Sequence, residues 1–216
     1  MKPASEQYLA PDVSDSLRQQ WETCDATFAH LTINRWLKDE EHLFRFWEKY
    51  FIPWFDFTGK TLVDYGCGGG YLGRLLLESY DLGQYVGLDI AQRSIDKAAE
   101  ILKRHRRVVV LQRLPVALSQ YHADILVCQA CIQHFDRDTY EAFFPAVNMS
   151  GIPELMLQIR RGDRLLFNPG DLRLACRTTH EDVAARLPAY TLVQMRDGCD
   201  KTGYCFLHLQ RRQEVP

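Results

Sequence analysis

The stretch from Thr61 to Gly73, TLVDYGCGGGYLG, constrains the fold more than any other part of the chain. A short apolar strand ends at Asp64 and runs into alternating glycines at Gly66, Gly68 and Gly70, where the chain must turn tightly and let a ligand approach its backbone. The leucines that follow recur at helical spacing. Because a helix start presents free N–H groups and a positive dipole end, we expect a small polar or anionic ligand above this loop.

Strand-like and helix-like segments alternate from Lys60 onward, which predicts a parallel sheet with helices on both faces. The predicted strands cover residues 60–65, 84–89, 108–112, 123–129, 154–160, 190–196 and 204–210. The predicted helices cover residues 70–80, 91–105, 114–120, 136–147 and 179–188. The fold class that follows is α/β, with a Rossmann-like, doubly wound sheet.

An N-terminal helical extension, residues 1–58, precedes this alternating region. A helical pattern spans residues 16–38 with an interruption, and a clearer apolar and aromatic stripe follows at helical spacing. The stripe consists of Leu43, Phe46, Trp47, Tyr50 and Phe51. Such a stripe is usually core packing; the alternative is a lid or a wall of the ligand site, which is our prediction for the extension as a whole.

Charge and composition limit the partners of the chain. The net charge of -2 and the pI near 6.4 do not have the basic character typical of a nucleic-acid binder, so a nucleic-acid partner is not expected. An apolar run of about 18 residues and a signal segment are both absent, so no membrane partner is expected. With seven scattered cysteines, we expect a reducing, cytoplasmic location. The sequence gives no indication of oligomeric state.

Ligands of an open α/β sheet bind beyond the carboxyl ends of its strands, at the switch point. Asp89 ends the second predicted strand, 23 residues after Gly66, which is close to the interval at which an acidic residue reaches ribose hydroxyls. One carboxylate accepts hydrogen bonds from both hydroxyls of a cis-diol. The alternative interpretation of Asp89 is a solvated residue that caps the next helix.

A nicotinamide cofactor is an alternative for this unit, because residues 68–73 also match the dinucleotide fingerprint G-x-G-x-x-G. The register argues against it. Gly66 already occupies the tight turn at the strand end, and Tyr71 then stands where the third glycine would fall. Asp64 is also unsuited to a phosphate loop, which gains nothing from a nearby negative charge, but it suits a ligand with an ammonium or sulfonium group.

Three segments resemble motifs of class I S-adenosylmethionine-dependent methyltransferases. Residues 63–70 resemble the first motif, an acidic residue followed by G-x-G-x-G; residues 86–90 resemble the second; and residues 123–129 with His134 resemble the fourth motif and its loop. The resemblance covers about residues 60–210. It implies a seven-stranded sheet whose last strand is antiparallel.

The resemblance makes residues 59–216 the S-adenosylmethionine-binding methyltransferase domain and implies roles for its motif residues. Gly66, Gly68 and Gly70 would pass beneath the methionine part of the cofactor. Asp64 would help to hold its amino group, and Asp89 would bind the ribose hydroxyls.

The same resemblance places Arg113 and Leu114 against or beside the adenine and turns Gln129 toward the methionine end. Arg113 departs from the family pattern, in which this position often carries an acidic residue that accepts from the adenine amino group. Arginine cannot accept, so adenine recognition would use backbone groups or stacking by Arg113.

Methyl transfer from a sulfonium is an in-line displacement, so the protein mainly aligns the acceptor and excludes water. Where the acceptor is a hydroxyl, a neutral imidazole near the methyl group can take its proton at physiological pH. His134, five residues beyond Gln129, is our candidate for this catalytic role. The alternative is a histidine that only packs, or caps the helix that starts near Asp136.

Two further patterns have ordinary explanations. Cys128 and Cys131 form a C-x-x-C pair that invites a zinc or redox interpretation with Cys199 and Cys205, but buried thiols acting as small apolar residues suffice, and no metal is expected.

A basic stretch follows the fifth predicted strand, and we interpret it as a solvated surface. The alternative is that it receives a phosphate or carboxylate of the substrate. The stretch consists of Arg160, Arg161, Arg164 and Arg173.

The expected function is transfer of a methyl group from S-adenosylmethionine to a small-molecule acceptor, at a hydroxyl oxygen. The tetrad of amino-base methyltransferases, Asn or Asp followed by Pro-Pro and an aromatic residue, is absent after the fourth strand, where residues 128–131 read CQAC. Alternatives are an RNA or protein methyltransferase that docks through the basic stretch, and a catalytically silent, cofactor-binding regulatory subunit.

Overall fold

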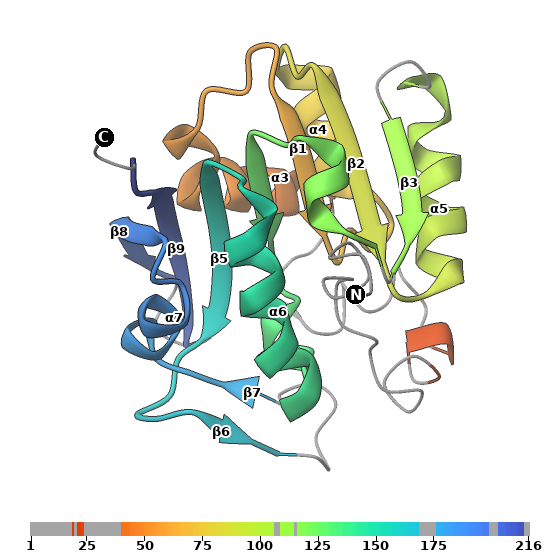
Figure 1. Ribbon diagram of the computed structural model, residues 1–216. Helices are drawn as coiled ribbons and strands as arrows, with labels where there is room; N and C mark the ends of the chain where they lie inside the picture. Colours follow the sequence, from red (N-terminus) through yellow and green to blue (C-terminus); the bar gives the residue numbers. More distant parts are fainter. Residues whose placement is uncertain are drawn as a thin grey trace, which may run out of the picture.

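The computed structural model describes residues 19, 21–23, 40–105, 109–114, 116–168, 176–198 and 203–213. A seven-stranded sheet in the order β3-β2-β1-β4-β5-β9-β8 forms its centre (Figure 1). The strands of this sheet are β1 (Thr61–Tyr65), β2 (Gln84–Asp89), β3 (Val109–Arg113), β4 (Ile125–Cys128), β5 (Glu154–Arg160), β8 (Tyr190–Asp197) and β9 (Tyr204–Arg211).

Strands β1 to β5 run parallel to one another, and β9 is antiparallel to both of its neighbours, β5 and β8. The chain builds outward from β1 through β2 to β3, and then crosses to β4 on the other side of β1. This reversal is the switch point of a doubly wound sheet. The predicted fold class is therefore confirmed, including the antiparallel last strand.

The central strands form where the sequence has short apolar runs. β1, β4 and β5 are buried along almost their whole length, as expected for parallel strands covered on both faces. The predicted strands at residues 84–89 and 154–160 coincide with β2 and β5. A two-stranded sheet of β6 (Leu166–Phe167) and β7 (Cys176–Arg177) was not predicted, because two-residue strands carry no periodic signal.

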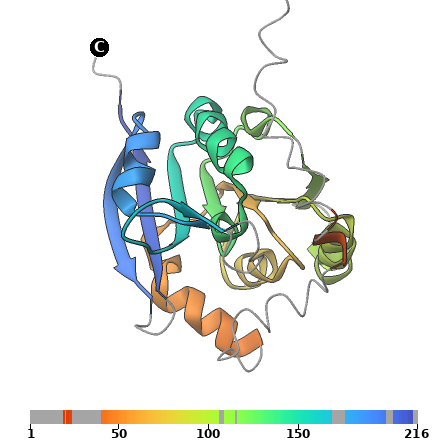
Figure 2. The ribbon, with the colours of Figure 1, turned by 90° about the horizontal axis from the view of Figure 1, so that it is seen from below.

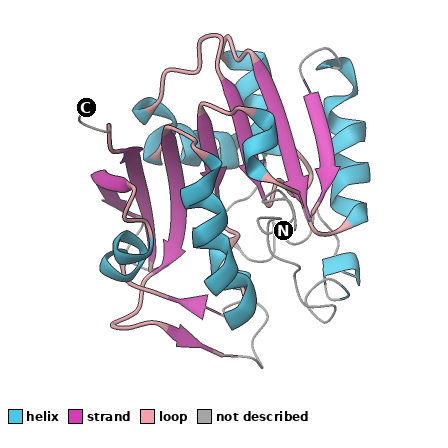
Figure 3. Cartoon of the chain, viewed as in Figure 1, coloured by secondary structure: helices cyan, strands magenta, loops and turns pink. Residues whose placement is uncertain are grey.

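Helices cover both faces of the sheet (Figures 2 and 3). The α-helices are α3 (Glu40–Tyr50), α4 (Tyr71–Ser79), α5 (Gln92–Leu102), α6 (Arg137–Ser150) and α7 (His180–Arg186), and the short 3-10 helices are η2 (Ile52–Trp54), η3 (Lys103–His105), η4 (Leu118–Tyr121) and η5 (Ile132–His134). α3, α4 and α5 contribute to one core cluster, and α6 and α7 contribute to the other. None of the helices in the described part of the chain is long and apolar enough to cross a membrane.

Helix α3 is part of the core. The four stripe residues within α3 and Phe51, which follows the helix, are all buried, and Trp47 is only 1% exposed. Phe46 and Tyr50 lie against Phe206 of β9, with ring centroids 5.6 and 5.3 Å apart. The interpretation of the stripe as core packing is confirmed, whereas the pattern over residues 16–38 lies outside the described residues apart from 19 and 21–23.

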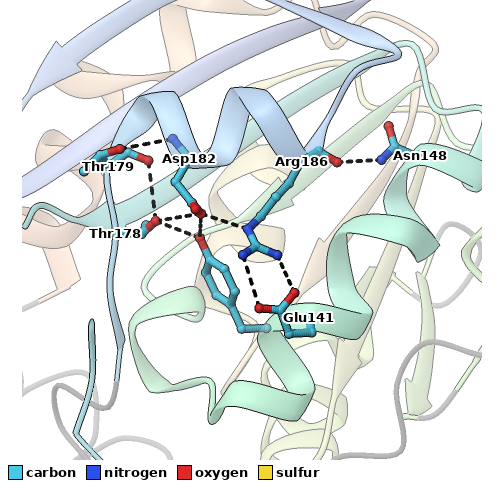
Figure 4. Close-up of polar contacts among 7 residues, drawn as sticks. Glu141, Asn148, Thr178, Thr179, Asp182 and Arg186 are labelled. Carbon is cyan, nitrogen blue, oxygen red and sulfur yellow. Dashed lines mark hydrogen bonds and ion pairs between the residues drawn. The ribbon is translucent and has the colours of Figure 1, made fainter. Parts of the chain in front are cut away.

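Polar contacts fasten α7 to α6 (Figure 4). The Arg186 guanidinium binds Glu141 of α6 with two nitrogens and, through Nε, lies 2.9 Å from Asp182 Oδ2. Tyr140 donates to the same Asp182 oxygen over 2.7 Å. The predicted helix start at Thr179 is confirmed, because its side chain accepts from the backbone N–H of Asp182.

We expect Trp47→Ala to lower the free energy of unfolding by about 3–5 kcal/mol, because it leaves a large cavity beneath α3. Trp47→Phe should lower it much less, since it keeps most of the ring and removes an indole N–H that has no hydrogen-bond partner among the described residues. Urea unfolding measures both changes. The exposed neighbour Glu48→Ala serves as control and should stay within about 0.5 kcal/mol; an equally small effect of Trp47→Ala would contradict the core role of α3.

Candidate active site

The glycine loop between β1 and α4 turns through backbone conformations that only glycine adopts readily. Gly66, Gly68 and Gly70 have φ values of 81°, 53° and 78°. The N–H groups of Gly66 and Cys67 both donate to the carbonyl oxygen of Leu88, at 2.8 and 2.9 Å. The loop is therefore tied to the carboxyl end of β2.

Close packing below the loop also excludes side chains. A Cβ atom at Gly66 would lie 2.5 Å from Cys131 Sγ, and one at Gly70 would lie 3.0 Å from Ala98 Cβ. Real Cβ atoms essentially never approach a neighbour as closely as 2.5 Å. The loop consequently leaves its backbone as the surface that a ligand can contact.

Asp89 holds the loop from the end of β2. Its Oδ2 accepts from the N–H of Gly68 and its Oδ1 from the N–H of Ala91, both at 2.9 Å. Burial raises the pKa of this carboxyl, and the hydrogen bonds from the backbone lower it. The side chain is buried and therefore not solvated, although it does hold the start of the next helix through Ala91. Hydrogen bonds from the Ser94 side chain and the Ile90 backbone also lower the pKa of this carboxyl.

Asp64 lies buried at the end of β1, 3% exposed, and accepts a 2.7 Å hydrogen bond from the Tyr85 hydroxyl. Burial raises the pKa of the Asp64 carboxyl to about 7; the Tyr85 hydrogen bond lowers it, and the charge of Asp89 raises it further. Gly73 makes room for this pair, because a Cβ there would lie 2.5 Å from Tyr85 Cζ. Packing against Tyr85 therefore explains the third glycine of the apparent dinucleotide fingerprint.

The next two predicted cofactor residues follow β3. Arg113 pairs with Asp89 in the parallel register of β3 and β2, and the N–H of Leu114 donates to the Asp89 carbonyl oxygen at 2.9 Å. The Leu114 side chain is buried in the core, and the Arg113 side chain lies outside the described part of the structure. Their backbone therefore lies beside Asp89, and their contact with adenine stays a prediction.

Gln129 begins the segment after β4. It is buried, and its side-chain amide donates to Gln158 Oε1 at 2.9 Å. The next residue, Ala130, has a φ of 52°, in the left-handed region that a residue with a Cβ rarely adopts. Such strain is common where a chain is held for binding or catalysis.

His134 ends the short helix η5 and is 4% exposed. Its Nε2 lies 3.2 Å from the side-chain nitrogen of Gln133, and its ring meets Trp21 edge-on, with centroids 4.9 Å apart. The helix that follows is capped by Asp136, which accepts from the N–H of Thr139 at 2.9 Å. His134 therefore packs in a polar setting and does not provide the cap of α6.

The C-x-x-C thiols lie next to each other below the glycine loop. Burial raises the pKa of Cys128 well above its ordinary value, and a hydrogen bond with Cys131 raises it further. Within the described ranges, no three His, Cys, Asp or Glu side chains come close enough to hold a metal ion. Cys199 and Arg173 lie outside the described residues.

The structure ties the predicted loop to Asp89 by a hydrogen bond, holds Asp64 through Tyr85, and places Gln129 and His134 after β4. Sequence reasoning missed Tyr85, which holds Asp64, and Gln158, which holds Gln129. It also missed Tyr204, which contacts Gln133 beside His134. Their only signal was a polar side chain inside a strand otherwise suited to burial.

Comparison with known proteins adds two findings. Residues 63–148, from β1 into α6, match a family model described as a methyltransferase domain. No curated protein sequence matches the chain.

Solved structures match over nearly the whole chain at low identity. The Burkholderia thailandensis 1,6-didemethyltoxoflavin-N1-methyltransferase, bound to its substrate and S-adenosylhomocysteine, has a TM-score of 0.63 and 16% identity over 93% of this chain and 89% of that one. The Synechocystis PCC 6803 magnesium protoporphyrin IX methyltransferase with bound S-adenosylhomocysteine has a TM-score of 0.61 and 14% identity over 92% and 95%. The [4+2]-cyclase SpnF has a TM-score of 0.64 and 14% identity over 94% and 97%.

Residues 63–148 thus resemble a methyltransferase domain, and the chain has the fold of class I S-adenosylmethionine-dependent methyltransferases. S-adenosylmethionine is the cofactor of this class. Because a cyclase shares the fold, the fold alone does not define the reaction. The reaction depends on the residues of the site.

We expect Asp64→Asn to change how stability depends on pH. A carboxyl whose pKa rises from 3.8 to about 7 on folding binds more protons in the folded state, so its contribution to stability falls as the pH rises from about 4 to 7. The asparagine variant has no carboxyl at this position and does not lose stability in this way. The difference in free energy of unfolding, variant minus unmodified chain, should therefore be larger at pH 8 than at pH 5, by up to a few kcal/mol. Urea unfolding at both pH values measures this difference. If the free energy of unfolding changes equally with pH in the two proteins, the raised pKa of Asp64 is contradicted.

Proposed function

We propose that the chain transfers the methyl group of S-adenosylmethionine to a hydroxyl oxygen of a small molecule. The observation that carries the proposal is the pair of buried acids, Asp64 and Asp89, at the glycine loop. Neither acid has a cationic partner among the described residues. A ligand with positive charge and a diol complements such a site, and S-adenosylmethionine supplies a sulfonium, an ammonium and a ribose.

The cofactor residues are assigned from these contacts. The backbone of Gly66, Gly68 and Gly70 would lie beneath the methionine part, while Asp64 would act on its amino group. Asp89, which the N–H groups of Gly68 and Ala91 hold in place, would accept from the ribose hydroxyls.

The remaining cofactor residues lie on either side of this centre. Arg113 and Leu114 would border the adenine, beside Asp89 in the register of β2 and β3. Gln129, which is fixed by Gln158, would face the methionine end near the transferred methyl group.

Two observations support a small-molecule acceptor. Similar solved structures include enzymes whose names specify small molecules, among them the toxoflavin enzyme and the mitomycin 7-O-methyltransferase MmcR, which has a TM-score of 0.61 and 16% identity over 90% of this chain and 60% of that one. The side chains after β4 are also buried, since Gln129, Gln133 and His134 are each at most 7% exposed. A small acceptor suits such buried residues better than a polymer.

The transfer itself needs alignment and one proton acceptor. The bond from methyl carbon to sulfur breaks with its electron pair on sulfur, the acceptor oxygen forms the new bond, and its proton leaves. We assign the proton to His134. Because its Nε2 faces the Gln133 amide, the acceptor hydroxyl would replace that amide contact at Nε2.

The segment before α3 supports the proposed lid or acceptor-site wall within residues 1–58. Trp21 contacts His134, and the Glu22 carboxylate accepts from the N–H of Gln92 at the start of α5 at 3.0 Å. One short segment thus touches both the acceptor side and the cofactor side.

Asp89→Ala should weaken S-adenosylmethionine binding roughly tenfold to a hundredfold, because charge-assisted hydrogen bonds are lost. Isothermal titration calorimetry measures the dissociation constant. The exposed Asp81→Ala, at the opposite ends of the strands, serves as control and should bind as the unmodified chain does. Equal affinity of Asp89→Ala and the control would refute the ribose assignment.

His134→Ala should lower turnover at least tenfold and leave cofactor affinity nearly unchanged, because the residue acts on the acceptor. The measurement is transfer of label from S-adenosylmethionine into small-molecule fractions of a cell extract, with His105→Ala as control. An unaltered rate would remove His134 from the mechanism. Cofactor binding without transfer to any fraction would favour a silent regulatory subunit, and label in RNA or protein would favour the polymer alternative.

A further inference from the structure

Three polar side chains meet on the acceptor side of the site, at the ends of β4 and β5 and the start of β9. Gln133 is fully buried, and its side-chain nitrogen donates to the Tyr204 hydroxyl over 3.4 Å. The Arg160 guanidinium lies over the Tyr204 ring, with Cζ 5.3 Å from the ring centroid. We call Gln133, Tyr204 and Arg160 the acceptor cluster.

One atom of this cluster lacks a partner. Gln133 Oε1 is buried and accepts no hydrogen bond from any described residue, whereas the nitrogen of the same amide faces both His134 and Tyr204. A carbonyl oxygen can only accept, so the group that would satisfy it is an O–H or N–H donor. A buried acceptor left unsatisfied costs about 1–3 kcal/mol, which makes a bound donor at this point favourable.

Arg160 is a hydrogen-bond donor that can bind an anionic acceptor. Its side chain is half-buried, and no carboxylate pairs with it among the residues that the structure describes. The adjacent Arg161 differs, because its guanidinium lies 2.6 Å from Asp197. A guanidinium that rests on an aromatic face keeps its N–H donors available for an oxyanion such as a carboxylate.

We propose that the acceptor cluster recognises a small hydroxy acid as the methyl acceptor. On binding, the hydroxyl donates to Gln133 Oε1, and during transfer its single proton passes instead to His134 Nε2. The carboxylate binds the Arg160 guanidinium. Both protein groups contact the Tyr204 side chain, Gln133 at its hydroxyl and Arg160 at its ring face. This inference rests on the proposed function and specifies its substrate class.

The test compares simple probes at saturating S-adenosylhomocysteine, so that no turnover occurs. The probes are 3-hydroxybenzoate, 4-hydroxybenzoate, the uncharged 4-hydroxybenzamide, and benzoate, which lacks the hydroxyl. The unmodified chain should bind at least one hydroxybenzoate more tightly than the amide and more tightly than benzoate. Calorimetry measures each dissociation constant.

Two variants separate the two contacts. Arg160→Met should weaken binding of the hydroxybenzoate roughly tenfold to a hundredfold and leave the amide within about twofold, because it removes a charge-assisted hydrogen bond. Gln133→Met should abolish the preference for the hydroxybenzoate over benzoate. Arg164→Met, at an exposed arginine on the same stretch, makes the same change in net charge and should change neither.

Controls keep the outcomes distinct. Arg160→Lys retains the positive charge and should restore part of the lost affinity, and thermal unfolding shows that each variant is folded. The inference is overturned if no hydroxybenzoate binds more tightly than the amide, or if Arg160→Met binds it as Arg164→Met does. Failure of S-adenosylhomocysteine itself to bind would overturn the proposed function instead.

Discussion

The hydrogen bonds of the Asp89 carboxylate are the contacts on which the rest of the site depends. One oxygen holds the glycine loop at Gly68 and the other holds the start of the helix after β2 at Ala91. The loop conformation, the helix start and the end of β2 are thereby fixed by one buried group. Backbone N–H donors make this burial tolerable, because they favour the charged form that burial disfavours. A residue that organises the loop in this way also presents its remaining lone pairs in a defined direction.

Charge divides the site into two halves. The half at β1 and β2 carries the buried acids Asp64 and Asp89, and the half at β5 and β9 carries Arg160 on the Tyr204 ring. A cationic cofactor and an anionic acceptor would each find a complementary partner in this arrangement. The same polarity would disfavour an acceptor bound in the cofactor half, because its carboxylate would meet two acids.

The fold followed from the sequence because its signals are local. Apolar runs identified β2 and β5 with their observed bounds, and the aromatic stripe identified the buried face of α3. The contacts between strands had no such signal. Tyr85 reaches Asp64 across 21 positions, and Gln133 reaches Tyr204 across 71. Such pairs become visible only when the strand order is known. The cofactor loop was therefore predictable, whereas of the acceptor cluster only Arg160 was singled out, as part of the basic stretch.

The N-terminal region illustrates the same distinction. Its aromatic stripe in α3 belongs to the core, where Tyr50 packs on Phe206. The segment at residues 21–23 does something different, since Glu22 supplies an acceptor at the start of α5, where Ala91 has no side chain that can cap the helix. That carboxylate complements the positive end of the helix dipole beside Asp89. The proposed lid or wall function of residues 1–58 therefore rests on the contacts of Trp21 and Glu22, because α3 belongs to the core.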